Sequence, residues 1–176
     1  MIIGILAGVA AIVALPLTAA LFVKNEYVIE REIIINKPKA EVFNYVKHLK
    51  NQEKFSKWVM LDPAKKTEER GIDGQVGFVY AWESKDKSAG KGEQEIKNII
   101  EGEKIDVEVR FERPFKNVAR TPFTVESVSE NQTKVKWGMI GRNAYPMNLM
   151  ILFLGGVLGK DLEASLGNLK SILEQK

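Results

Sequence analysis

The sequence predicts an α+β fold for most of the chain. Three features lead to this prediction: an early strand followed by a short amphipathic helix, a central run of segments with alternating apolar residues, and a C-terminal segment with helical periodicity. Short connections between the central segments favour an antiparallel meander. A curved antiparallel sheet buries one face well against a long helix, which is a typical α+β arrangement.

The chain begins with an apolar segment, and its first charged side chain is Lys24. As a helix rising about 1.5 Å per residue, this segment would reach about 33 Å and cross a bilayer core. A secretory signal peptide is the alternative, but no Lys or Arg precedes the run, and the run exceeds the usual length of about 7–15 residues. We therefore expect residues 1–24 to form an uncleaved transmembrane anchor and residues 26–176 to form one domain. The basic residues just after the segment favour a cytoplasmic domain.

The N-terminal part of the domain reads as a strand and two short helices. Residues 27–35 are rich in β-branched and aromatic side chains and end shortly before a proline. From residue 38 to 49, apolar residues recur at three- and four-residue spacing, which predicts an amphipathic helix. A second short helix or turn is expected at residues 52–57. Phe55 and Trp58 lie three residues apart and can face the same core.

A polar loop is expected over residues 62–74, and strands follow it. From Gln75 the residues alternate, so that Val76, Phe78, Tyr80 and Trp82 should share one face of a strand. The same alternation predicts further strands at residues 93–100, 105–112, 119–128 and 133–141. On residues 105–112 the acidic and basic residues alternate outward, which predicts a solvated face with surface ion pairs.

Residues 146–176 are predicted to form the long C-terminal helix, since apolar residues from Met147 through Met150 and Leu154 continue at helical spacing. The first half of this segment is apolar nearly all round. It is too short to span a bilayer by itself, so we expect it to be buried in the domain.

Composition excludes several classes of function. The formal net charge is +3, and basic residues are interspersed with acidic ones, which does not favour nucleic-acid binding. The chain has no Cys and a single His, so thiolate and histidine metal sites are not expected. The glycine-containing turns lack the features of phosphate or dinucleotide loops, and no cofactor is predicted.

The order of elements and several local motifs resemble the polyketide cyclase/dehydrase branch of the START-like (SRPBCC) superfamily. The resemblance runs from about Tyr27 to the C-terminus, although Phe55 stands where the family often has Trp. It implies a helix-grip fold, in which a curved antiparallel sheet wraps around the long C-terminal helix and encloses a hydrophobic cavity. It also implies a bacterial inner-membrane location for the anchored chain. The matching motifs are Arg31-Glu32-Ile33-Ile34-Ile35-Asn36-Lys37-Pro38, Val42-Phe43, Trp58, Asp62-Pro63, Gly74-Gln75-Val76-Gly77, Tyr80-Ala81-Trp82-Glu83, Gly90-Lys91-Gly92, Phe111 and Pro114.

The candidate ligand-binding residues are aromatic and flexible apolar side chains expected to line that cavity, together with one polar residue, Gln94. The Tyr hydroxyl and Trp N–H groups would orient a ligand. Ordinary core packing also explains each aromatic residue taken alone. The full set is Trp58, Phe78, Tyr80, Trp82, Gln94, Phe111, Trp137, Met139, Met150 and Leu154.

The leading functional hypothesis is a membrane-anchored module that binds a lipid or another hydrophobic small molecule. Two alternatives stay open, because a fold of this kind does not define one activity. One is an enzyme acting on an apolar, polyketide-like substrate, for which no catalytic constellation is recognisable. The other is a chaperone-related or envelope-stress module that binds a protein partner.

Overall fold

The structure is a computed structural model that describes residue 12 and residues 14–175. Residues 1–11 and 13 of the predicted anchor lie outside this part of the chain, and residues 14–20 are helical. Among the described residues, no helix combines the length and the apolar character needed to cross a membrane. The transmembrane anchor and the domain limits at residues 26–176 therefore stay predictions.

The described residues form one eight-stranded antiparallel sheet with the order β1-β8-β6-β5-β4-β3-β2, and β7 pairs with β5 and β8. Every strand except β1 pairs with a strand next to it in sequence, as expected for a meander. The chain thus returns to its first strand at β8. The strands are β1 Glu26–Ile35, β2 Lys66–Arg70, β3 Val79–Glu83, β4 Lys91–Ile100, β5 Lys104–Arg113, β6 Asn117–Arg120, β7 Phe123–Ser129 and β8 Gln132–Arg142.

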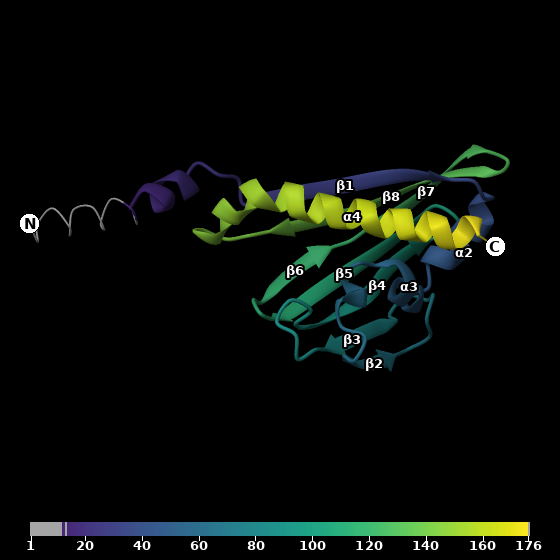
Figure 1. Cartoon of the computed structure of the whole chain (residues 1–176), viewed down its shortest axis with the longest axis horizontal. Helices are drawn as coiled ribbons and strands as arrows, with labels where there is room; N and C mark the ends of the chain where they lie inside the picture. The colour runs from purple at the N-terminus through teal and green to yellow at the C-terminus, as the bar shows by residue number, and fades with distance from the viewer. Residues whose placement is uncertain (1–11, 13, 176) are drawn as a thin grey trace, which may run out of the picture.

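Three α-helices complete the domain: α2 (Lys39–Val46), α3 (Gln52–Phe55) and α4 (Ile151–Glu174). Figure 1 shows α4 running alongside β1 and across the face of the sheet. Short 3₁₀ turns, Leu49–Asn51, Val59–Leu61 and Met147–Met150, join or precede the helices. The predicted α+β fold, with a large antiparallel sheet and a long C-terminal helix, is confirmed.

The core lies between the second half of α4, the short helices and the sheet. Leu162, Leu166 and Leu169 recur at four- and three-residue spacing on α4 and are all buried. They face an aromatic cluster in which Trp137 stacks on Phe123 with ring centroids 4.5 Å apart. Offset stacking of this kind contributes beyond the area that it buries.

The predicted strand over residues 119–128 is two strands, β6 and β7. Thr121 and Pro122 separate them, because proline has no N–H to continue a ladder. The strand expected from Gln75 also begins later, at Val79. Gly77 has a φ of +87°, a turn conformation, and Val76 is 60% exposed, so the prediction that Val76 shares the inner face was wrong.

The expectation that the first half of α4 is buried was also wrong. Leu154 and Leu158 face the sheet, but Leu152, Phe153 and Val157 on the opposite face are between 61% and 72% exposed. No described element covers this face. We call these three residues the apolar face of α4.

The outer surface of β4 and β5 carries an ion-pair network centred on Arg110, as the alternating charges predicted. Its guanidinium lies 2.8 Å from Glu93, 2.8 Å from Glu95 and 2.5 Å from Glu108. Partial burial works to raise the pKa of Glu93, but hydrogen bonds from Arg110 and Arg70 outweigh it and hold that pKa below its ordinary value. Hydrogen bonds from Lys97 and Arg110 lower the pKa of Glu95 in the same way.

This network predicts a pH-dependent part of the stability. Because the two carboxyl pKa values are lower in the folded state, their contribution is complete above the ordinary value of 4.5 and is lost as pH falls through the lowered values. Arg110→Met should cost about 1–2 kcal/mol near neutral pH. Urea unfolding at neutral and acidic pH measures both effects. An identical acid-induced loss in wild type and variant would contradict the assignment.

Candidate ligand-binding cavity

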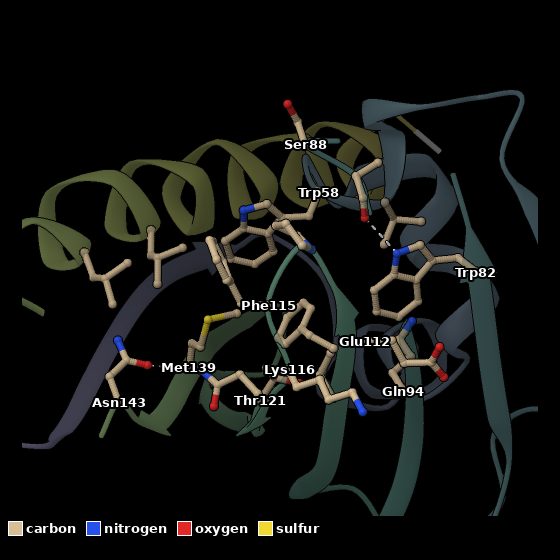
Figure 2. Close-up of a pocket in the computed structure, with 18 of the residues that line it drawn as sticks. Trp58, Trp82, Ser88, Gln94, Glu112, Phe115, Lys116, Thr121, Met139 and Asn143 are labelled. Atoms are coloured by element: carbon tan, nitrogen blue, oxygen red, sulfur yellow. Dashed lines mark hydrogen bonds between the residues drawn. The ribbon is translucent and has the colours of Figure 1, made fainter. Parts of the chain in front are cut away.

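A cavity of about 1000 Å³ lies between the concave face of the sheet, the first half of α4 and the segment from α3 to β2. This volume suits a small organic ligand. Figure 2 shows the ring of Trp58 beneath α4 and Trp82 on the other side of the space, with Phe115 between them and Met139 on the far side of Trp58 from Trp82. The lining is largely apolar and aromatic, with a limited set of polar groups.

All predicted ligand-binding residues except Phe78 lie on the cavity wall. Strands β3 to β5 supply Tyr80, Trp82, Gln94 and Phe111, whereas the others come from the segment after α3, from β8 and from the start of the C-terminal helical region; these others are Trp58, Trp137, Met139, Met150 and Leu154. Gln94, the one predicted polar residue, is 5% exposed. Their role in binding a ligand stays a prediction.

Phe78 is instead a core residue, with 1% exposure, and it is not part of the cavity wall. Its carbonyl accepts a hydrogen bond from the N–H of the fully buried Ile96, whereas Tyr80, two residues later, pairs with Gln94. The inner face of β3 therefore passes from core to cavity along its length. The alternating pattern predicts which face of the sheet a side chain is on, but it does not predict whether that part of the face lines the core or the cavity.

Hydrogen bonds to α4 hold Trp58 in the wall. Its indole Nε1 donates to Asp161 Oδ2 at 3.1 Å, and Lys57 Nζ lies 2.6 Å from the other carboxylate oxygen. The N–H of Lys57 donates to Ser165 Oγ at 2.9 Å, and Asn168 Nδ2 donates to the carbonyl of Phe55. The segment after α3 is thus fastened to the helix that forms the opposite wall.

A second polar group, formed by Tyr80, Glu53 and Lys65, is satisfied within the protein. The Tyr80 hydroxyl donates to Glu53 Oε1. Lys65, whose side chain is 5% exposed, donates through Nζ to Glu53 Oε2 and to the Val59 carbonyl, both at 2.8 Å. A buried charge requires this pairing. Because Glu53 already accepts its hydrogen, the Tyr80 hydroxyl is engaged as a donor within the protein, and its role in orienting a ligand stays a prediction.

Trp82 is positioned by a close approach to Gly92 on the neighbouring strand. Its Nε1 donates to the Ala89 carbonyl at 2.9 Å, so this donor is also engaged within the protein. A Cβ at Gly92 would lie 2.6 Å from the Arg110 carbonyl oxygen and 2.8 Å from the Trp82 ring. Only glycine allows the indole and the neighbouring backbone to approach β4 this closely here.

Gly92→Ala should therefore lower the free energy of unfolding by about 1–3 kcal/mol and displace Trp82. Urea unfolding and the near-UV circular dichroism of the tryptophans measure the two effects. Gly102→Ala is a less suitable control because its φ is positive, so Gly155→Ala, with open space around its Cβ, is the matched comparison. Equal effects of Gly92→Ala and Gly155→Ala would contradict the close approach.

Sequence reasoning missed two buried polar residues of the wall, Gln52 and Ser56. They are 3% and 1% exposed and stand at i and i+4 on one side of α3 and its C-cap. The sequence analysis expected a short helix or turn here but did not place either residue in the wall. Their spacing around Phe55, which is fully buried, is the signal that could have found them.

The cavity rim is apolar and lies beside the N-terminal segment. Among the lining residues, Phe115, Tyr145, Met147 and Met150 are between 44% and 67% exposed. Asn148, in the same turn as the two methionines, is 1% exposed, and its Nδ2 donates to the carbonyls of residues 20 and 23 at 2.7 and 2.8 Å. The end of the N-terminal helical segment is thus tied next to the rim.

The comparisons support the fold. Norcoclaurine synthase from Thalictrum flavum, solved with dopamine and hydroxybenzaldehyde, matches with a TM-score of 0.63 and 12% identity over 86% of this chain and 88% of its own. The Aha1 dimer protein from Colwellia psychrerythraea matches with a TM-score of 0.58 and 15% identity, covering 84% of this chain and 96% of its own. A protein from Chromobacterium violaceum matches with a TM-score of 0.59 and 16% identity, covering 84% of this chain and 96% of its own. The fold is that of the helix-grip proteins.

No family model matches the chain, and no curated protein matches its sequence. At the identities above, structural likeness shows the fold alone, since one fold supports many functions. Within the part of the chain that the structure describes, no group of three or more His, Asp and Glu residues could hold a metal ion. The side chains that line the cavity are therefore the basis for any statement about its ligand.

Proposed function

We propose that this protein is a membrane-associated module that binds a lipid or another hydrophobic small molecule in its helix-grip cavity. The cavity itself is the observation that carries the proposal. About 1000 Å³ of space lined by aromatic and aliphatic side chains is large for a packed core, whose voids rarely exceed a water molecule. An apolar ligand that fills this space gains the free energy of leaving water.

The location of apolar surface supports a position at a bilayer. The apolar face of α4 lies on the same helical region as the rim methionines Met147 and Met150, and that region is tied by Asn148 to the apolar N-terminal segment. Exposed clusters of this kind mark interaction surfaces. Lys24, Lys116 and Arg142 are exposed around the same end and would attract anionic lipid headgroups.

In this arrangement the cavity opens toward the membrane. A hydrophobic ligand could pass between bilayer and cavity along the apolar rim without crossing water. The predicted anchor at residues 1–24 would hold the domain there with almost no linker, since β1 begins at Glu26. This part of the proposal depends on the anchor, whereas ligand binding depends on the cavity.

Photo-crosslinking tests ligand binding. The full chain in detergent is irradiated with an aliphatic hydrocarbon that carries a diazirine, and the labelled peptides are mapped by mass spectrometry. We expect labels on cavity residues such as Val109 and Met139, because they line the space but are at most 7% exposed and so are shielded from the micelle. Labels confined to Leu152, Phe153 and Val157 would show surface association only and would contradict the proposal.

Fluorescent labelling tests the membrane position, and the absence of native Cys makes single-site labelling clean. Phe153→Cys with an environment-sensitive dye should show a blue shift and quenching by brominated lipids in vesicles that contain anionic phospholipid. Glu130→Cys is the matched control, since the β7–β8 turn lies at the end of the domain away from the N-terminal segment (Figure 1). Equal quenching at both positions, or at neither, would contradict the docking.

A further inference from the structure

Two polar side chains of the cavity wall, Tyr27 and Gln94, are buried and yet unpaired. They are 8% and 5% exposed, and both line the cavity. Neither the Tyr27 hydroxyl nor the Gln94 amide has a hydrogen-bond partner among the described residues. Their polar atoms are also not fully enclosed, in contrast to the unpaired atoms of Gln52, Ser56 and Trp137. A molecule in the cavity can therefore reach the phenol oxygen and the amide, which otherwise lack a partner.

The ring of Tyr27 lies across the neighbouring strand. Tyr27 on β1 pairs with Gly141 on β8, and a Cβ at Gly141 would collide with the hydroxyl oxygen and Cζ of Tyr27. The glycine thus allows the phenol to reach about one strand spacing from β1 toward the middle of the sheet. Burial raises the pKa of Tyr27 above its ordinary value of 10.0, so the hydroxyl keeps its proton and can donate it in a hydrogen bond.

The strand register places Gln94 on the same line across the inner face of the sheet. From Gly141 the pairing continues to Ala119 on β6. Ala119 pairs with Val109 on β5, which in turn pairs with Gln94 on β4. Three strand spacings give a separation of at most about 14 Å between Gly141 and Gln94, and the concave curvature shortens it. The Tyr27 hydroxyl and the Gln94 amide are thus two polar points separated by the apolar side chains of Ala119 and Val109.

The charges of the cavity wall favour a neutral ligand at these two points. Lys65 and Glu112 are held in ion pairs, whereas Lys116 and Arg142 are exposed. The buried part of the wall, as far as the structure describes it, therefore carries no unpaired charge. A charged group of a ligand buried there would lack a counter-ion, which is strongly unfavourable.

From this arrangement we infer that the ligand is an elongated, neutral apolar molecule with two separated hydroxyl or carbonyl oxygens, one bound by the Tyr27 hydroxyl and the other by the Gln94 amide. The inference rests on the proposed function and names its ligand class. A phenol and an amide each donate and accept hydrogen bonds, so both kinds of oxygen fit. A ligand without these oxygens would leave both side chains unpaired, and such sites discriminate against it.

Competition against the hydrocarbon diazirine probe tests the inference on the full chain in detergent. The competitors are octane, octane-1,8-diol and the isomer octane-1,4-diol, with concentrations corrected for partition into the micelle. The extended 1,8-diol spans a little less than the upper limit set by the strand spacing, whereas the 1,4-diol places its second hydroxyl against the apolar side chains between the two points. Wild type should bind the 1,8-diol about fivefold more tightly than the 1,4-diol, the factor that corresponds to one net hydrogen bond.

Two variants each remove one polar point and keep the cavity apolar: Tyr27→Phe and Gln94→Met. In either variant only one hydroxyl of each diol can find a partner. The preference for the 1,8-diol should therefore fall to about twofold or less, and octane should bind as it does to wild type. Ser84→Ala should retain the full preference. It is the matched control because Ser84 is buried outside the cavity wall and is hydrogen-bonded to Asp62 and to the N–H of Asp86.

Thermal unfolding without added ligand gives a second readout. Tyr27→Phe removes a hydroxyl that has no partner, so this variant should melt at the same temperature as wild type or higher. Ser84→Ala breaks existing hydrogen bonds and should melt lower. A lower melting temperature for Tyr27→Phe would show that its hydroxyl is already bonded in the ligand-free protein and would contradict the inference.

The binding results separate this inference from the proposed function. Equal binding of the two diols by wild type, or a preference that survives in either Tyr27→Phe or Gln94→Met, would overturn the two-point inference. In that case displacement of the probe by octane would still support an apolar ligand in the cavity. If the probe does not label cavity residues at all, the proposed binding function itself is wrong.

Discussion

Phe55→Ala is expected to lower the free energy of unfolding by about 3–5 kcal/mol. Phe55 is fully buried, and its ring contacts Tyr45, Phe123 and Trp137 with centroid distances of 6.3, 6.4 and 5.8 Å. Truncation removes these contacts and leaves a void beside an already large cavity. Urea denaturation followed by circular dichroism measures the loss.

Phe153→Ala is the matched control for this prediction. Its ring is 72% exposed on the apolar face of α4, so the same truncation should change the free energy of unfolding by at most about 0.5 kcal/mol in detergent. Similar losses for the two variants would mean that the aromatic cluster does not form the centre of the core.

The second large effect is expected from filling the cavity. The double variant Val109→Trp/Leu158→Trp places two indoles from opposite walls, β5 and α4, into space that a ligand would occupy. Binding of the diazirine probe should fall at least tenfold, which corresponds to about 1.4 kcal/mol or more. The melting temperature should change little, since the side chains enter empty space and bury apolar area.

The control for cavity filling adds the same two side chains on the outside. Val118 on β6 and Ala164 on α4 are exposed and do not line the cavity. Val118→Trp/Ala164→Trp should bind the probe as wild type does. If the filled and the control variants bind equally, the probe is held somewhere other than the cavity.

Sequence patterns predicted the fold well because they report local geometry. Alternation located β5 and β8 almost to the residue, and helical spacing located α4, since both periods follow from backbone geometry. The break at Pro122 and the late start of β3 at Val79 were missed. A turn precedes Val79, and Thr121-Pro122 is an irregular break between β6 and β7; an alternating pattern does not register such interruptions.

The cavity wall was predicted less completely because lining depends on position along an element as well as on the face. Phe78 and Tyr80 share a face, yet only Tyr80 reaches the cavity. Gln52 and Ser56 are polar and were not predicted in the wall, but the packing of α3 against α4 buries them. The apolar face of α4 was wrongly expected to be buried. The first half of the helix is apolar nearly all round, so its sequence does not indicate which side meets the sheet.

Native mass spectrometry of the full chain, purified from membranes in a mild detergent, tests the central claim most directly. The account predicts one bound hydrophobic molecule per chain, recovered by solvent extraction, and absent from Val109→Trp/Leu158→Trp but retained by Val118→Trp/Ala164→Trp. Fragmentation of the released molecule should reveal a largely apolar body. A wild-type chain that never carries or takes up such a molecule, or adducts that persist equally in the filled variant, would contradict the claim that the cavity is a ligand-binding site.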